Sequence, residues 1–189
     1  MNALYSIARY YIPPRLKKMG LQAIFDATAT AFDHQAPVTR RMTFDKSLET
    51  YARFTELAVT TAIDGRHDLL ENQAKLRRNA FNVGLRFRAL FGVSSRKDVM
   101  DVARLLYRMI GIDFHGTAGG EITISRCGFD RFYSPRTCRV MSSFDEGVLA
   151  GLSGEGNLVF TGRLTEGQPY CEAHFEFKEQ PSENSHRRR

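Results

Sequence analysis

Apolar residues in the first 111 positions recur every three to four residues, the spacing of amphipathic helices. Five segments carry this pattern: 2–11, 16–32, 44–63, 68–91 and 95–111. Pro13 and Pro14 stop the first segment, and Gly92 closes the fourth. Ser95, with Asp98 three residues later, matches a capping box at the start of the fifth. The pattern predicts that the N-terminal part is helical.

The spacing changes near residue 112, where glycines become frequent and strict alternation takes over. Strands are expected at 121–127, 158–164 and 170–178, and the last two would form a β-hairpin with a five-residue connection at 165–169. Between them, Ser143 and Glu146 match a second capping box, which predicts a short helix that ends at Leu152. Cys138 and Asp145 would then lie in the preceding loop and at the start of this helix.

Helices followed by strands predict an α+β fold, with the helical N-terminal two-thirds packed on a C-terminal antiparallel sheet that has one inserted short helix. We expect residues 1–178 to form a single domain. Residues 179–189 have no apolar periodicity and end in three arginines, so we expect a disordered basic tail.

The charge pattern gives little sign of a macromolecular partner. Three of the net +6 charges are the terminal arginines, 187–189. The densest basic group within the domain lies on one predicted helix and comprises Lys75, Arg77, Arg78, Arg86 and Arg88. No nucleic-acid motif accompanies it, so a solvated helix face is favoured and no specific nucleic-acid partner is expected. The pattern leaves the oligomeric state open.

The chain has no apolar run near the ~20 residues that a transmembrane segment needs. Residues 1–20 lack the apolar core of a signal peptide. We therefore expect a cytoplasmic protein, whose cysteines would be reduced thiols or metal ligands.

Candidate chemistry concentrates in the strand-rich part, which holds all three cysteines: Cys127, Cys138 and Cys171. Ten residues separate the first two and 32 separate the last two, which is not a CxxC zinc spacing. Each thiol could pack as a small hydrophobe, bind a metal, or act as a nucleophile with a pKa depressed by a nearby helix N-terminus. Asp145 could be an acid or base, or could simply favour a helix dipole.

Two histidines are weaker candidates. Strand alternation places His174 on the face opposite Cys171, which favours a solvent-facing side chain. His115 lies in the glycine-rich segment 114–120, which could cradle an anion but is better explained as a turn, since no P-loop Lys-Ser/Thr pair follows.

Several of these residues together resemble the L-2-amino-thiazoline-4-carboxylic acid hydrolase family. The resemblance rests on Ile124-Ser125-Arg126-Cys127, on Cys138, Asp145 and Gly162, and on the run from Gly167 to Phe175. It covers residues 70–178, so that 66–178 would be a hydrolase-like part after a helical part at 1–65. A more distant likeness is to 4-vinyl reductase domains, which are small-molecule-binding modules.

The resemblance implies hydrolysis of a small, cyclic, carboxylated C=N substrate of the thiazoline or amidine type, opened toward an N-carbamoyl amino acid. Catalysis would fall to four residues: Cys127, Cys138, Asp145 and Cys171. Arg126, Arg139 and His174 would bind the substrate, and the cysteines could instead hold a divalent metal that acidifies water.

Two positions depart from the family pattern. Gly128 stands where proline often follows the first cysteine, and Ser142 occupies the place of a further cysteine. These departures favour an alternative, a non-catalytic small-molecule- or metal-binding module on the same fold. A third hypothesis, drawn from the charge balance alone, is an accessory protein that docks through its basic helix and tail.

Overall fold

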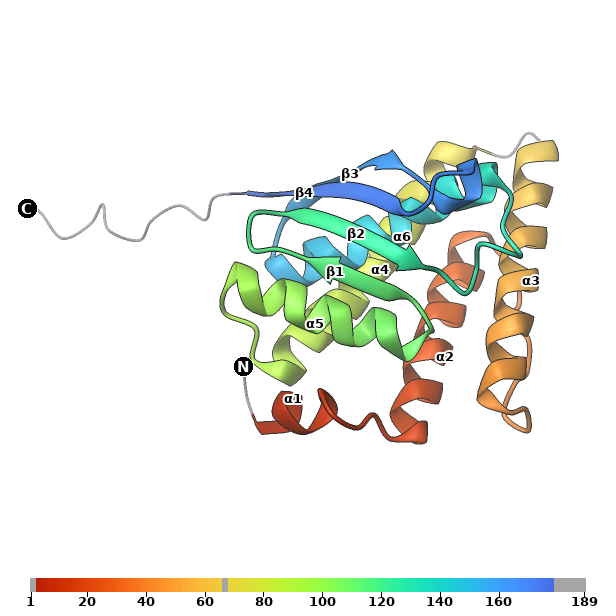
Figure 1. Cartoon of the computed structure of the whole chain (residues 1–189). Coiled ribbons are helices and arrows are strands. Elements are labelled where there is room, and N and C mark those ends of the chain that lie inside the picture. Colours follow the sequence, from red (N-terminus) through yellow and green to blue (C-terminus); the bar gives the residue numbers. More distant parts are fainter. Residues whose placement is uncertain (1–2, 66–67, 179–189) are drawn as a thin grey trace, which may run out of the picture.

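The computed structural model describes residues 3–65 and 68–178. Five helices come first, and a sixth lies between strands of the sheet (Figure 1). They are α1 (Ala3–Ala8), α2 (Pro14–Ala31), α3 (Phe44–Asp64), α4 (Leu69–Phe91), α5 (Arg96–Met109) and α6 (Pro135–Ser153). No helix in these described ranges is both long enough and apolar enough to cross a membrane.

The four strands form one antiparallel sheet, ordered β1-β2-β4-β3. They are β1 (Asp113–Gly116), β2 (Glu121–Arg126), β3 (Gly156–Gly162) and β4 (Cys171–Phe177), and a 3-10 turn, η1 (Leu164–Glu166), connects the last two. Alternation along β4 buries Cys171, Ala173 and Phe175 on one face, while Glu172 and His174 stay exposed on the other. Figure 1 shows α5 and α6 beneath the sheet, and the helices thus cover its apolar face.

The α+β prediction is confirmed, with five helices before residue 111 and, after it, the sheet with α6 inserted between two of its strands. The capping box at Ser95 is present, with Asp98 as its partner. The strand at 113–116 was not predicted, because four residues with a terminal glycine are too short to show an alternation. It pairs with β2 as a hairpin, so the glycine-rich segment around His115 is a strand and a turn. The predicted tail at 179–189 lies outside the described residues.

The prediction of a short inserted helix after Ser143 is wrong. Helix α6 has 19 residues and begins at Pro135, with Ser134 as its N-cap. The Ser134 hydroxyl accepts a 3.2 Å hydrogen bond from the backbone N–H of Thr137, and proline is well suited to a first helical position. Ser143 lies in the middle of this helix, and Cys138 and Asp145 both lie on it rather than in a loop.

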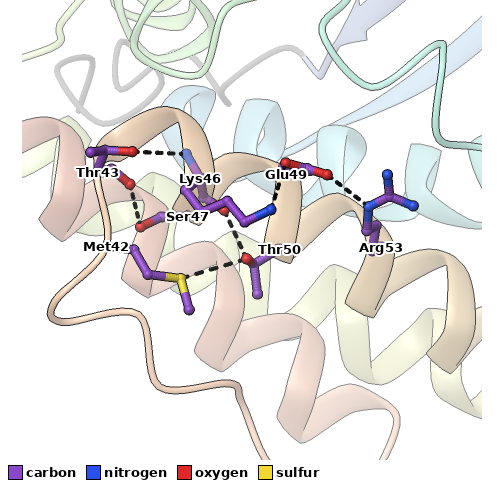
Figure 2. Close-up of polar contacts among 7 residues, drawn as sticks. All are labelled: Met42, Thr43, Lys46, Ser47, Glu49, Thr50 and Arg53. Carbon is purple, nitrogen blue, oxygen red and sulfur yellow. Dashed lines mark hydrogen bonds and ion pairs between the residues drawn. The ribbon is translucent and has the colours of Figure 1, made fainter.

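Helix α3 begins in a dense set of polar contacts (Figure 2). Thr43 is its N-cap and accepts a hydrogen bond of 3.3 Å from the backbone N–H of Lys46. Glu49 forms 3.0 Å ion pairs with Lys46 and Arg53, one helical turn to either side. These contacts fix the start of the helix that carries Tyr51 and Phe54 toward the core.

Glycines allow α4 and α6 to pack very closely. A Cβ added at Gly84 would lie 2.3 Å from the carbonyl oxygen of Val148, and one at Gly151 would lie 2.2 Å from that of Phe81. Gly147 is as tight, since its Cβ would lie 2.3 Å from the carbonyl oxygen of Arg77. Only a residue without a side chain fits such contacts, and they hold α6 rigidly against α4.

Candidate functional site

A cavity of about 90 Å³ lies between α6, the sheet and the helical part. Its walls come from seven elements and from the loop before α6; the elements are α2, α3, α5, α6, β2, β3 and β4. The lining is largely apolar and aromatic, but it includes all four predicted catalytic residues: Cys127, Cys138, Asp145 and Cys171. The structure therefore brings together residues that are spread over 45 positions of the chain.

Helical spacing places the α6 residues on one face. Cys138, Ser142 and Asp145 follow one another at intervals of four and three, so their side chains point to the same side of the helix. Cys127 lies just after β2, and Cys171 is the first residue of β4. The two strands pair directly, with Ile124 opposite Cys171, which brings both thiols to the same end of the sheet.

Asp145 is the ionisable centre of the cavity. Its carboxylate Oδ1 accepts a 2.7 Å hydrogen bond from the hydroxyl of Tyr107 on α5. Burial raises the pKa of Asp145 to about 6, although the Tyr107 hydrogen bond and the positive charge of Arg163 both oppose the shift. A carboxyl group with this pKa can give up and take back a proton near neutral pH, which is what acid–base catalysis requires.

The three thiols are free and protonated at neutral pH. Burial raises the pKa of Cys127 to about 12, and it also raises the pKa of Cys138 and of Cys171. The nearby Asp145 charge acts in the same direction on all three. The expected depression by a helix N-terminus is therefore wrong: desolvation is the largest effect and raises the pKa even for Cys138, in the first turns of α6.

Aromatic hydroxyls line the side of the cavity near α3. Tyr51 is fully buried, and its hydroxyl lies 3.1 Å from that of Thr28 on α2. Burial raises the pKa of Tyr51 to about 12 and that of Tyr133 well above its usual value, so both stay neutral donors or acceptors. The ring of Phe129 stacks on that of Tyr133 and meets that of Tyr51 edge to face, so aromatic surface closes this side.

The sequence did not predict a role for Arg163, which follows β3. Its guanidinium lies 4.6 Å from the ring centre of Phe160 and donates a 3.1 Å hydrogen bond to the hydroxyl of Ser142, and both partners line the cavity. Only 15% of its side chain is exposed. The register of β3 shifts between Phe160 and Gly162, so simple alternation could not place Arg163 on the inner side.

The predicted substrate-binding residues lie elsewhere. Arg126 and His174 are exposed, at the end of β2 and on the outer face of β4. Arg139 is 64% exposed and forms a 2.7 Å ion pair with Glu166. None of these three residues lines the cavity. Their role in substrate binding therefore stays a prediction that no contact with the cavity supports.

Within residues 3–65 and 68–178, no three histidine, cysteine, aspartate or glutamate side chains are arranged to hold a metal ion. Comparison with known proteins adds no assignment, because neither a protein-family model nor a curated protein sequence matches this chain.

Proposed function

We propose that this protein is a hydrolase-like protein that takes a small, cyclic, carboxylated C=N compound into the cavity and opens its ring. One observation carries the proposal: a half-buried aspartate with a pKa of about 6 lines a largely apolar cavity together with three thiols. A perturbed acid in a concave apolar site is typical of catalytic centres.

Asp145 would be the acid–base group. In a thiazoline, the oxygen of water would bond to the C=N carbon while the Asp145 carboxylate takes up a proton. One proton of the water would reach the ring nitrogen and the other the sulfur, as the carbon–sulfur bond breaks and a carbonyl forms. The product would be a carbamoyl compound with a free thiol.

The thiols are unsuited to the nucleophilic step in their resting state. At neutral pH, a Cys127 thiol with a pKa of about 12 is almost entirely protonated, so its ionisation would add a large energetic cost. Water activated by Asp145 is the less costly nucleophile. Cys127, Cys138 and Cys171 would then shape the cavity and donate weak S–H hydrogen bonds to the substrate. Free thiols persist in a reducing compartment, and we propose the cytoplasm.

The same protonated thiols favour a second candidate, a non-catalytic module that binds the small molecule without converting it. The two functions share the cavity and differ only in turnover. A carboxyl group buried for binding alone would change ligand affinity and leave no chemical product.

The test is a ring-opening assay with L-2-amino-thiazoline-4-carboxylate, followed by mass detection of the carbamoyl product. We expect turnover by the wild-type protein and a loss of at least about 100-fold in Asp145→Asn, the usual effect of removing a general acid–base group. Glu172→Gln, on the exposed face of β4, is the matched control and should keep full activity. A wild-type protein that binds the compound but forms no product is the binding module; one that does not bind it contradicts both.

A further inference from the structure

The segment that links β3 to β4 carries two buried polar atoms with no hydrogen-bond partner among the described residues. They are Nε of Arg163 and the hydroxyl oxygen of Thr165. A buried donor without a partner costs about 1–3 kcal/mol, and native proteins leave few such groups. The Thr165 hydroxyl has the Cys138 thiol beside it as a weak partner, so Nε of Arg163 is the donor that most clearly lacks an acceptor in the polypeptide.

Neither residue lines the cavity itself, but both contact residues that do. Arg163 contacts two lining residues, Phe160 through its ring and Ser142 through a hydrogen bond. Thr165 lies beside the thiol of Cys138, whose pKa its hydroxyl lowers. The backbone N–H of Leu164, between them, donates to the sulfur of Cys171 at 3.4 Å. The whole segment therefore turns its polar groups toward the thiol side of the cavity.

The charge of Arg163 is incompletely balanced. Glu166 is its nearest carboxylate at 3.9 Å, yet the same oxygen lies 2.7 Å from Arg139. Asp145 feels the charge of Arg163 but hydrogen-bonds to Tyr107. The guanidinium, mostly buried and short of acceptors, would gain from an anionic partner.

We propose that Arg163 and Thr165 form an anion subsite of the cavity that holds the carboxylate of the bound molecule. The inference rests on the proposed function and deepens it, since it names the residues that select an acidic substrate. A carboxylate has only acceptors, and it matches a guanidinium N–H beside a hydroxyl donor. A carboxylate bound there would give the two residues different roles. Arg163 would bind the substrate carboxylate, and Asp145 would move protons at the ring.

The test compares two ligands of nearly the same shape, of which only one carries a negative charge. They are 2-aminothiazole-4-carboxylate, an aromatic analogue that does not open, and the corresponding carboxamide. Calorimetric titration would give their dissociation constants for the wild type, Arg163→Gln and Thr165→Val. Arg136→Gln is the control, because it removes an exposed arginine in the first turn of α6.

We expect Arg163→Gln to weaken carboxylate binding about 10- to 100-fold and carboxamide binding by less than about threefold, the difference made by a charged hydrogen bond. Thr165→Val should show the same selectivity at about three- to tenfold. If Arg163→Gln does not fold, the two dissociation constants of Thr165→Val, one for each ligand, test the subsite instead. Equal losses for the two ligands, or no loss, would overturn the subsite while leaving the cavity as a binding site. A wild-type protein that binds neither ligand would overturn the proposed function as well.

Discussion

The hydroxyl of Tyr107 donates a 2.7 Å hydrogen bond to the carboxylate of Asp145, and so joins α5 to α6 inside the cavity. This bond opposes the effect of burial on the pKa of Asp145, because it stabilises the charged form. Two consequences can be measured.

The first concerns the pH dependence of turnover. If Asp145 acts as a base, activity should rise with pH through about 6, as the carboxyl group loses its proton. Tyr107→Phe removes a hydrogen bond that lowers this pKa, so the rise should move to higher pH. Turnover rates of the wild type and of Tyr107→Phe, measured between pH 4 and 9, test both expectations. An unmoved profile would show that the tyrosine does not tune the carboxyl group; Tyr170→Phe, on the surface, is the control.

The second concerns stability. A carboxyl group whose pKa is raised on folding favours the folded state below its unfolded pKa, and this contribution is lost as the pH rises through the folded pKa of about 6. Asp145→Asn carries no charge, so at pH 8 it should be more stable than the wild type by about 1–3 kcal/mol. The difference should shrink as the pH falls to 4. Urea unfolding at both pH values tests this, and a variant less stable at pH 8 would contradict it.

The thiols should be slow to react in the folded protein. Burial raises the pKa of Cys127, Cys138 and Cys171, and thiol reagents attack the thiolate. In denaturant, all three should react rapidly with a disulfide reagent, whereas the native protein should show no fast phase. A rapid reaction of one or more thiols before unfolding would mean that the cavity is open and the thiolates are accessible.

The close contact of α4 and α6 should be intolerant of any side chain. Gly151→Ala places a Cβ 2.2 Å from the Phe81 carbonyl oxygen, so α6 must shift and Asp145 with it. We expect a loss of about 2–4 kcal/mol and a lower activity. Gly162→Ala is the control, since its Cβ would meet nothing closer than 3.6 Å. If the two variants unfold alike in a thermal melt, the packing argument fails.

The sequence predicted the helical part well because five segments keep one apolar period over many turns. It missed the start of α6 because the polar first turn, Arg136 to Arg139, delays the apolar repeat until Val140. The signal was nevertheless present: Ser134 followed by Pro135 is a good helix start. The capping-box pattern at Ser143 matched by chance, inside a helix that was already formed.

The candidate site was predicted in part. The three cysteines and Asp145 were grouped at one site and do line one cavity, but Cys138 and Asp145 lie on α6 and not in a loop or at a helix start between strands. Sequence patterns could not identify Tyr51 and Tyr107 as cavity residues, because both come from helices distant in the sequence and only tertiary packing brings them to the cavity. Arg163 was hidden by the irregular register of β3.

The central claim is that this cavity is the ligand site, and two substitutions at one position test it. Cys127→Ala enlarges the cavity and Cys127→Leu fills it, so only the second should exclude a ligand. The measurement is calorimetric titration with 2-aminothiazole-4-carboxylate. The account predicts that the alanine variant binds within about threefold of the wild type and that the leucine variant, still folded, shows no binding heat. Equal binding by both would place the ligand elsewhere and contradict the account.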